Sequence, residues 1–201
     1  LSLHDALPIF TLLTATISAI TLTNNVKAAT KWNTSKSVTK EENGIKYSAY
    51  LTEDGKESWI YQIKLSKKIT KLTLPKEINQ AKLTRVGFGK ELYNKGEDED
   101  AYQNLFGDTI EPWHNCYGDL SNDDKNKQTI ETVAIPGTVN QLEIATFSGM
   151  KKLKSVVIPE QTASVPAYTF AKCSALSKVT FSKNMNEIDS KIGRASCRER
   201  V

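Results

Sequence analysis

The clearest hydrophobic pattern in the chain recurs every 23 residues near its carboxyl end. The stretch VAIPGTVNQLEIATFSGMKKLKS (133–155) aligns without gaps with VVIPEQTASVPAYTFAKCSALSK (156–178), and VTFSKNMNEIDS (179–190) begins a third copy. Such a period predicts stacked repeat units that share one core. The matched apolar or proline positions are Val133, Val156 and Val179; Ile135, Ile158 and Phe181; Pro136 and Pro159; Leu142, Val165 and Ile188; Phe147 and Phe170; Met150 and Cys173; Leu153 and Leu176.

Each unit is predicted to contain a short strand, a turn and a connecting segment whose apolar side chains pack in the core. Val-x-Ile points two side chains to one face, and the proline that follows ends the strand because it cannot donate to a sheet ladder. A short helical or irregular stretch then buries Phe147 or Phe170. Strands one unit apart run in the same direction, so the pattern predicts an α/β solenoid with a parallel β ladder.

An earlier copy of the strand cue lies upstream, in LTLPKEI (72–78). The distance along the chain from Leu72 to Val133 exceeds one period by more than the length of a further unit. We therefore expect a solenoid over residues 72–190, truncated in its third regular repeat, with an insertion at 88–129 in the first coil. The aromatic residues of this insertion form either a ligand-facing patch that includes Trp113 and Tyr117, or a cover on the first coil.

Residues 45–71 are predicted to form a β-hairpin that caps the solenoid. Apolar residues alternate with polar ones on both sides of a turn at 53–56, which is typical of two half-buried strands. Because a repeat stack needs an atypical first unit to shield its end, a cap is the simplest interpretation. The polar residues 29–44 are expected to be a flexible leader. The two predicted faces consist of Ile45, Tyr47, Ala49 and Leu51, and of Trp59, Tyr61, Ile63 and Leu65.

The two ends of the chain resemble a translated sequencing-library adapter. One DNA string, read on opposite strands, encodes both residues 1–9 and residues 192–200. We therefore expect residues 1–9 and 191–201 to be adapter-derived and exclude them from fold reasoning. Without their four basic and two acidic residues the net charge falls from +4 to +2, so no strongly basic face argues for nucleic acid. Two cysteines, Cys116 and Cys173, remain, and whether they pair is left open.

Residues 10–28 are predicted to be a signal peptide whose charged n-region is missing. The uncharged run over residues 10–22 is too short to cross a membrane as a helix. Val26 and Ala28 occupy the −3 and −1 places of a cleavage site between Ala28 and Ala29. We therefore expect a secreted or cell-surface protein with no transmembrane span in this fragment.

Residues that could support catalysis are scarce. His114 is the single histidine outside the expected adapter segments, and Cys173 occupies a core position that Met150 fills in the preceding repeat. Oxygen-bearing side chains at 119–124 lack the spacing of a known calcium loop. The sequence therefore predicts a protein that is not an enzyme, with no catalytic residues, no cofactor and no metal site.

The pattern Val-x-Ile-Pro, followed by Val139, Leu142, a small residue before Phe147, then Met or Cys and Leu, resembles the BspA-like leucine-rich repeats of secreted and surface bacterial proteins. Thr146 and Thr169 stand where that family usually has alanine. The resemblance implies a non-catalytic protein that binds or adheres to a protein or glycan ligand on host or neighbouring cells. The alternative is an accessory binding region of a longer secreted enzyme.

Residues of the predicted strands that point away from the core form candidate ligand contacts. Side chains alternate across a strand, so stacked units line these residues up in two outward columns. Another interpretation is a plain solvated sheet with ligand contact elsewhere, as on the insertion. The columns are Thr132, Ser155 and Lys178, and Ala134, Val157 and Thr180.

Overall fold

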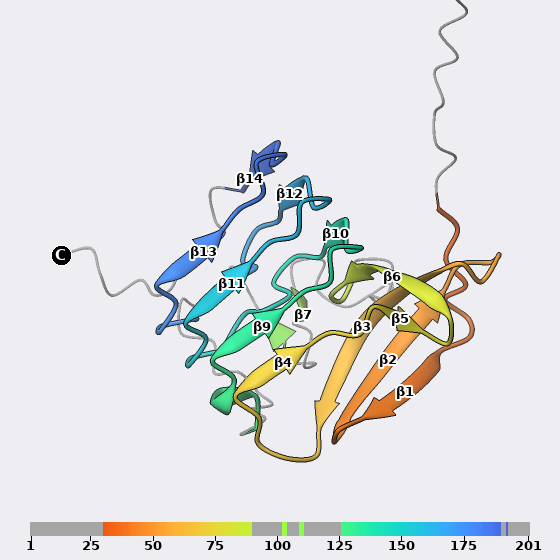
Figure 1. Cartoon of the computed structure of the whole chain (residues 1–201), viewed down its shortest axis with the longest axis horizontal. Coiled ribbons are helices and arrows are strands. Elements are labelled where there is room, and N and C mark those ends of the chain that lie inside the picture. The colour runs from red at the N-terminus through yellow and green to blue at the C-terminus, as the bar shows by residue number, and fades with distance from the viewer. Residues whose placement is uncertain (1–29, 90–101, 104–108, 111–125, 190–191, 193–201) are drawn as a thin grey trace, which may run out of the picture. The chain divides into compact units, whose positions relative to one another are not determined.

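The computed structural model describes residues 30–89, 102–103, 109–110, 126–189 and 192 (Figure 1). The chain divides into two compact units, residues 1–30 and 31–201, and every described strand belongs to the second. The expected adapter segment 1–9, the signal peptide and its cleavage site at Ala28 and Ala29 lie outside the described residues. So does the adapter segment 191–201, except for Ile192.

An antiparallel meander opens the described chain. Its strands are β1 (Val38–Glu42), β2 (Ile45–Leu51) and β3 (Glu57–Leu65). The two-residue turn between β1 and β2 places Asn43 and Gly44 at φ of 53° and 78°, a backbone region that Asn-Gly tolerates well. The expectation of a flexible leader over 29–44 is therefore wrong for residues 38–42, which pair with β2 along their whole length.

A β-bulge rearranges the two expected faces of the β2–β3 hairpin. The register shifts between Ser48 and Ala49, so that Ala49 pairs with Ile60 and Tyr61 is the extra residue. A bulge of this kind turns the residues before it to the opposite side of the sheet. Trp59 and Tyr61 consequently leave the face of Ile63, which corrects the predicted alternation. The core face now holds Ile45, Tyr47, Ala49, Ile60, Ile63 and Leu65.

Four short strands form the parallel ladder expected from the repeats. They are β4 (Lys71–Thr73), β9 (Thr132–Ala134), β11 (Ser155–Val157) and β13 (Lys178–Thr180), in the spatial order β13-β11-β9-β4. Thr132 pairs with Ser155, and Ser155 with Lys178, so each residue lies beside its counterpart in the next unit. We call residues 130–189 together with β4 the repeat stack.

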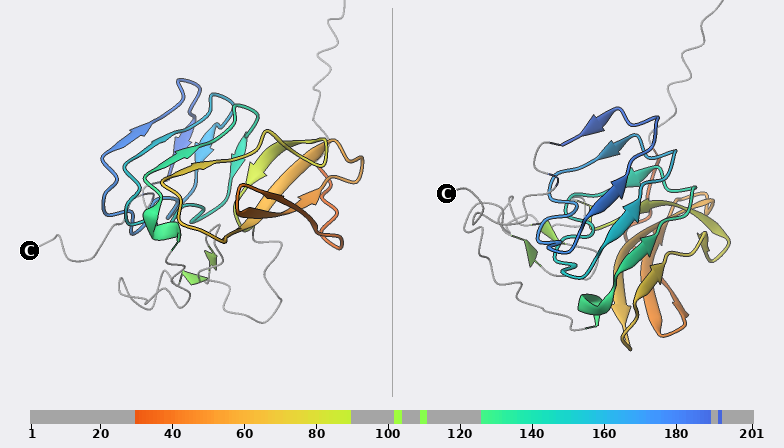
Figure 2. Two further views of the ribbon diagram at one scale, coloured as in Figure 1. Left: turned by 60° about the horizontal axis from the view of Figure 1, so that its bottom comes forward. Right: turned by 60° about the vertical axis from the view of Figure 1, so that its left-hand side comes forward.

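A second set of parallel pairs joins the repeat stack to the meander. β6 (Ala81–Val86) pairs with β3 on one side and with β10 (Gln141–Leu142) on the other. β12 (Ser164–Val165) pairs with β14 (Glu187–Ile188) in the later units. The strand order β1-β2-β3-β6-β10 therefore carries one sheet from the meander into the first units of the stack. We call β1, β2, β3, β5 and β6 the N-terminal sheet (Figure 2).

The first coil contains extra chain before the expected insertion. β5 (Glu77–Ile78) folds back on β6 through Asn79 and Gln80, both with positive φ, as in a two-residue hairpin. Because of this hairpin, the chain from Leu72 to Val86 is longer than the chain between their partners in the next unit, Val133 and Leu142. Part of the additional length therefore lies upstream of residue 88, where the sequence interpretation began the insertion.

The expected insertion at 88–129 is described only in part. β7 (Tyr102–Gln103) pairs antiparallel with β8 (Thr109–Ile110). The chain returns to the stack through the 3-10 helix η2 (Lys127–Thr129). Asn126 donates to the Leu65 carbonyl at 3.0 Å and Thr129 to the Ile69 carbonyl at 2.8 Å, so the returning chain is tied to the loop between β3 and β4.

The connecting stretch of each unit consists of turns, and within the described residues the α-helical part of the expected class is not confirmed. Ala145 and Tyr168, one unit apart, have φ of 59° and 57°. Gly149 and Lys172 follow with φ of 80° and 58°. Left-handed residues four apart interrupt a right-handed helix, so the backbone bonds from unit to unit instead, as from the Phe147 amide to Thr169 at 3.0 Å.

The shared core of the repeat stack is built around two aromatic rings. Phe147 and Phe170 are 0% and 3% exposed, and their rings stack with centroids 6.0 Å apart. This confirms the prediction that successive units share these side chains. In the last unit the matched positions open to solvent: Phe181 is 39% exposed against 2% for Ile158.

Candidate binding surfaces

The six predicted contact residues lie on the three neighbouring strands β9, β11 and β13 of the first ladder. The register places Ser155 beside Thr132 and Lys178, and Val157 beside Thr180. Val157 is 60% exposed, which is unusual for an aliphatic side chain flanked by buried neighbours. We call this surface, with residues 132, 134, 155, 157, 178 and 180, the ladder face.

The ladder extends by one strand beyond the residues that sequence reasoning selected. Lys71 pairs with Thr132, and Thr73 pairs with Ala134, so both continue the two columns on β4. The sequence match between Leu72 and Val133 could have predicted this, because Lys71 and Thr73 flank Leu72 as Thr132 and Ala134 flank Val133. Between the columns, Val133 and Val156 are 5% and 1% exposed and point into the core.

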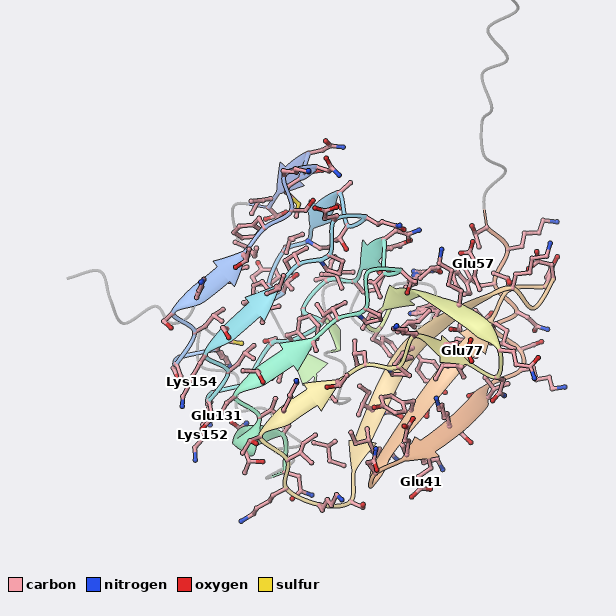
Figure 3. All side chains as sticks on the ribbon, viewed as in Figure 1. Glu41, Glu57, Glu77, Glu131, Lys152 and Lys154 are labelled. Atoms are coloured by element: carbon pink, nitrogen blue, oxygen red, sulfur yellow. The ribbon has the colours of Figure 1, made fainter. Side chains whose placement is uncertain are left out.

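A charged edge borders the ladder face. Lys154, just before β11, donates to Glu131, just before β9, with an Nζ to Oε2 distance of 2.8 Å. That hydrogen bond, together with the positive charge, lowers the pKa of Glu131. Figure 3 shows Glu131, Lys152 and Lys154 gathered at one end of the ladder strands. Because the pair is well exposed, its contribution to stability is small.

A cluster of aromatic rings covers the other side of the N-terminal sheet. The rings of Tyr50 and Tyr61 stack with centroids 4.5 Å apart, and Tyr50 also lies 5.6 Å from Trp59. Trp32 meets Trp59 edge-on at 5.7 Å, and Phe88 meets Tyr61 at 6.4 Å. We call these five residues the aromatic face. Burial, and then the neighbouring Tyr61, raise the pKa of Tyr50.

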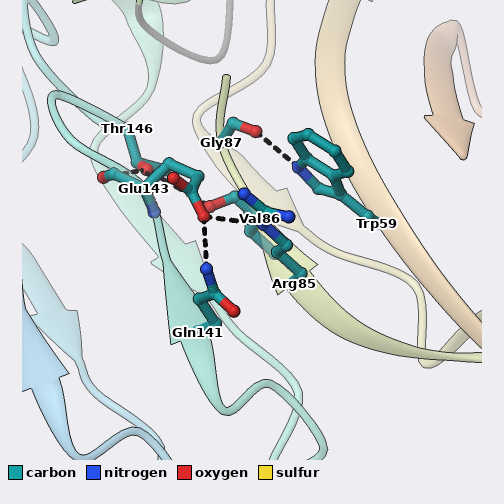
Figure 4. A network of polar contacts seen from close by, with 7 residues as sticks. All are labelled: Trp59, Arg85, Val86, Gly87, Gln141, Glu143 and Thr146. Atoms are coloured by element: carbon teal, nitrogen blue, oxygen red, sulfur yellow. Dashed lines mark hydrogen bonds and ion pairs between the residues drawn. The ribbon is translucent and has the colours of Figure 1, made fainter. Parts of the chain in front are cut away.

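A buried ion pair lies at the junction of this sheet and the first regular unit (Figure 4). Arg85 Nε donates to Glu143 Oε1 at 2.7 Å, and Gln141 Nε2 donates to the same oxygen at 2.7 Å. The Arg85 guanidinium also lies 3.7 Å from the centroid of the Trp59 ring. Both charged side chains are largely buried, at 4% and 12% exposed, so their ion pair offsets part of the cost of removing each charge from water.

Close backbone packing completes the junction. The Trp59 indole donates to the Gly87 carbonyl at 2.7 Å. Gly87 has φ of 114°, and a Cβ there would come within 2.7 Å of the Glu143 Cβ. The Thr146 hydroxyl donates to the Glu143 carbonyl at 2.6 Å and accepts from its amide at 3.1 Å. Threonine at this repeat position, a departure from the family's usual alanine, therefore holds the turn that carries Glu143.

Cys173 is a core residue and a free thiol. It is 4% exposed, and its thiol donates to the Phe147 carbonyl at 3.1 Å. Burial raises the pKa of Cys173 to about 12, so the nucleophilic thiolate is not available near neutral pH. The free thiol gives no support to the Cys116–Cys173 bridge that the sequence left open.

Several candidates from the sequence are not placed by the structure. Trp113, Tyr117, Cys116 and His114 lie outside the described residues. Within the described ranges no three His, Cys, Asp or Glu side chains gather where they could hold a metal ion. The part of the chain that the structure describes also contains no helix of the length and apolar character needed to cross a membrane.

The aromatic face was missed by sequence reasoning. The alternation in 57–65 assigned Trp59 and Tyr61 to the same side as Ile63, and a bulge depends on cross-strand pairing that one strand's pattern does not reveal. Arg85 and Glu143 were missed as well, because 58 residues separate them and neither stands in a motif.

The short parallel ladder, the shared aromatic core and the aligned outward columns are features of a repeat fold. Residues 125–195 match the family described as BspA type leucine rich repeat region (6 copies). The expected resemblance is thereby confirmed: this part of the chain is similar to BspA-type leucine-rich repeat regions.

Among solved structures, a leucine-rich cell surface protein from Faecalibacterium prausnitzii A2-165 is similar to this chain. The two share 14% sequence identity with a TM-score of 0.28, and the match covers 75% of this chain and 44% of that chain. No curated protein matches the chain.

Proposed function

We propose that this chain is a non-catalytic binding module of a secreted or cell-surface protein, and that it holds a protein ligand on the ladder face. The observation that carries the proposal is the alignment of six outward residues across β9, β11 and β13, backed by buried valines. Residues whose side chains do not pack in the core can differ from unit to unit while the fold stays the same. Such a face suits recognition of a protein on a host or neighbouring cell.

The pairing of equivalent residues in successive units favours a regular solenoid as the scaffold of this surface. Side-chain bonds from one unit to the next support it: Thr162 donates to the Val139 carbonyl, and Ser177 to the Lys154 carbonyl. In a solenoid each unit contacts mainly its neighbours, so further units would extend the ladder face without altering the units already present.

Export is the second part of the proposal. The uncharged run over 10–22, followed by Val26 and Ala28, supports secretion with cleavage before Ala29. Amino-terminal sequencing of the protein from culture medium or the cell surface should begin at Ala29. Recovery from the cytosol alone, with residues 10–28 intact, would refute secretion without affecting the ladder face.

The ladder face is tested by a double variant, Val157→Glu with Thr180→Glu. Glutamate at these neighbouring exposed residues on β11 and β13 would add two negative charges to the ladder face. Binding of labelled protein to intact host cells and to immobilised matrix proteins should fall by about tenfold or more, the equivalent of roughly 1.4 kcal/mol.

The matched control is Gln161→Glu with Asn186→Glu. Both residues are exposed and belong to the same two units, Gln161 in a turn and Asn186 directly before β14, so the control adds the same charge away from the ladder strands. Circular dichroism and chemical denaturation verify the fold of both variants. Equal binding by the parent and a folded Val157→Glu, Thr180→Glu variant would show that the ladder face is not the site.

A further inference from the structure

The charges around the ladder face are distributed unevenly. The four residues before each of the ladder strands β4, β9, β11 and β13 contain five lysines and one acidic residue, Glu131. The four residues after each strand contain two lysines and two glutamates. The strands themselves add Lys71 and Lys178 and no acidic residue. Positive charge therefore gathers at the end of the ladder where the strands begin.

This group of lysines accounts for the positive charge of the whole chain. Outside it lie 20 of the 27 basic residues and 22 of the 23 acidic residues, counting Glu131 with the group, so the rest of the chain is slightly acidic. All seven lysines are exposed. We call them the lysine edge: Lys67, Lys68, Lys71, Lys151, Lys152, Lys154 and Lys178.

The backbone holds the segments of the lysine edge in register. The Glu131 amide donates to the Thr70 carbonyl at 2.7 Å, the Lys154 amide to the Glu131 carbonyl at 2.8 Å, and the Ser177 amide to the Lys154 carbonyl at 3.1 Å. These segments therefore lie side by side in the same order as the strands that follow them. Figure 3 shows Lys152 and Lys154 together at this end of the ladder.

Two of the lysines lie at opposite sides of one row across the ladder. Lys71, Thr132, Ser155 and Lys178 pair in sequence from β4 to β13. Neighbouring strands are about 4.8 Å apart, so the Cα atoms of Lys71 and Lys178 are about 14 Å apart. An extended chain rises about 3.3 Å per residue, so a partner segment with carboxylates about four residues apart reaches both lysines.

The one carboxylate of this edge is already engaged. Glu131 bonds to Lys154 with an Nζ to Oε2 distance of 2.8 Å. Its pKa is lowered first by this bond and by the charge of Lys154, and the charge of Lys152 adds to the effect. One carboxylate thus faces several ammonium groups. A surface with such an excess of one sign attracts partners of the opposite sign and sets their orientation.

The residues beside the lysines indicate what kind of anion fits. Val157, at 60% exposed, and the small uncharged residues Ala134 and Thr180 make up the column farther from the lysine edge. Single-stranded nucleic acid is bound by a continuous basic groove with aromatic side chains for stacking, whereas the ladder face has no aromatic residue and has lysines along one border. A protein segment supplies both carboxylates and apolar side chains, so it matches both columns.

We infer that the protein ligand of the ladder face is acidic. Carboxylates of the partner form ion pairs with the lysine edge, and its apolar side chains contact Val157. This inference rests on the proposed function and adds the chemistry of the partner to it.

The first test changes only the sign of the charge added to the ladder face. Val157→Lys with Thr180→Lys is compared with Val157→Glu with Thr180→Glu in binding to intact host cells and immobilised matrix proteins. The lysine pair should bind within about threefold of the parent, while the glutamate pair should lose about tenfold or more. Equal losses by the two folded variants would leave the ladder face as the site but refute an acidic partner. No loss in either would refute both the site and the inference.

The second test removes lysines from the edge. Lys71→Gln with Lys178→Gln should weaken binding about fivefold, while Lys71→Arg with Lys178→Arg should bind like the parent because the charge is kept. The matched control, Lys76→Gln with Lys183→Gln, removes two exposed lysines from the other end of the strands and should change binding less than about twofold. Raising NaCl from about 0.1 M to about 1 M shortens the screening length from about 10 Å to about 3 Å and should weaken the parent more than Lys71→Gln with Lys178→Gln.

Soluble competitors identify the class of anion. A random copolymer of glutamate and tyrosine should bind the parent and displace it from the cells, and heparin or single-stranded DNA at equal charge should displace it less. The inference is overturned if heparin or DNA competes better than the copolymer, or if the two glutamine pairs weaken binding equally.

Discussion

The repeat stack and the N-terminal sheet are stabilised by different kinds of contact. In the stack each unit bonds to the next at a constant spacing, as when Ser148 donates to Ala171 and Thr162 to Val139, each pair 23 residues apart. The N-terminal sheet joins the stack through the pairing of β6 with β10 and through side-chain contacts that do not recur from unit to unit, such as Arg85 with Glu143, 58 residues apart. The effect of a substitution should therefore depend on which kind of contact it removes.

The largest expected effect comes from the shared core of the stack. Phe147→Ala would empty a fully buried site stacked on Phe170, and truncation of a buried phenylalanine typically costs roughly 3–5 kcal/mol. Urea denaturation followed by circular dichroism measures the loss. The control Phe181→Ala removes a ring that is 39% exposed and should cost much less. A loss below about 0.5 kcal/mol for Phe147→Ala would contradict a shared core.

At the Arg85–Glu143 ion pair, replacing one residue should lower the free energy of unfolding more than replacing both. Glu143→Ala removes a carboxylate that pairs with the buried Arg85 guanidinium and should cost roughly 3 kcal/mol. Combining it with Arg85→Met also removes the buried positive charge and should recover a large part of that loss. A double variant that is less stable than either single variant would show that the pair is not coupled as the structure indicates.

A smaller effect is expected from raising the pH. The pKa of Cys173 is raised from 9.0 to about 12 and that of Tyr47 from 10.0 to about 12, both chiefly by burial. Between the ordinary and the raised pKa values the unfolded state binds fewer protons than the folded state. The stability that these two protonated groups contribute is therefore fully present below pH 9 and is lost as the pH rises toward 12. Unfolding free energies measured from pH 8 to 11 should show this decline, with a shallower slope in Cys173→Ala. An identical slope in the variant would exclude the thiol as a contributor.

The contrast also explains what the sequence could predict. Residues such as Val156, Phe147 and Phe170 recur at the spacing of the units, and a unit that cannot bury its apolar side alone must place them against a neighbour. The ladder, its inward valines and its outward columns followed from that rule. The Asn43-Gly44 turn was a visible hairpin signal, although the polar surroundings led to the expectation of a leader.

The features that could not be predicted depend on pairings between distant segments. The bulge that turns Trp59 and Tyr61 away from the core lies in a strand that pairs with both β2 and β6, each with its own register shift. The burial of Arg85 likewise follows from the position of Glu143 in the next unit. No local pattern in one sequence specifies such contacts.

The ladder face is tested most directly by six single variants, in which glutamate replaces each of its residues in turn. Binding to intact host cells and the free energy of unfolding are measured on the same preparations. Binding should fall at several adjacent positions, most at Val157 in the central strand. At the exposed positions Val157, Lys178 and Thr180 the free energy of unfolding should change by less than about 0.5 kcal/mol, as is usual for exposed sites. The proposal would be contradicted by six folded variants that all bind like the parent, or by binding losses that simply follow losses of stability.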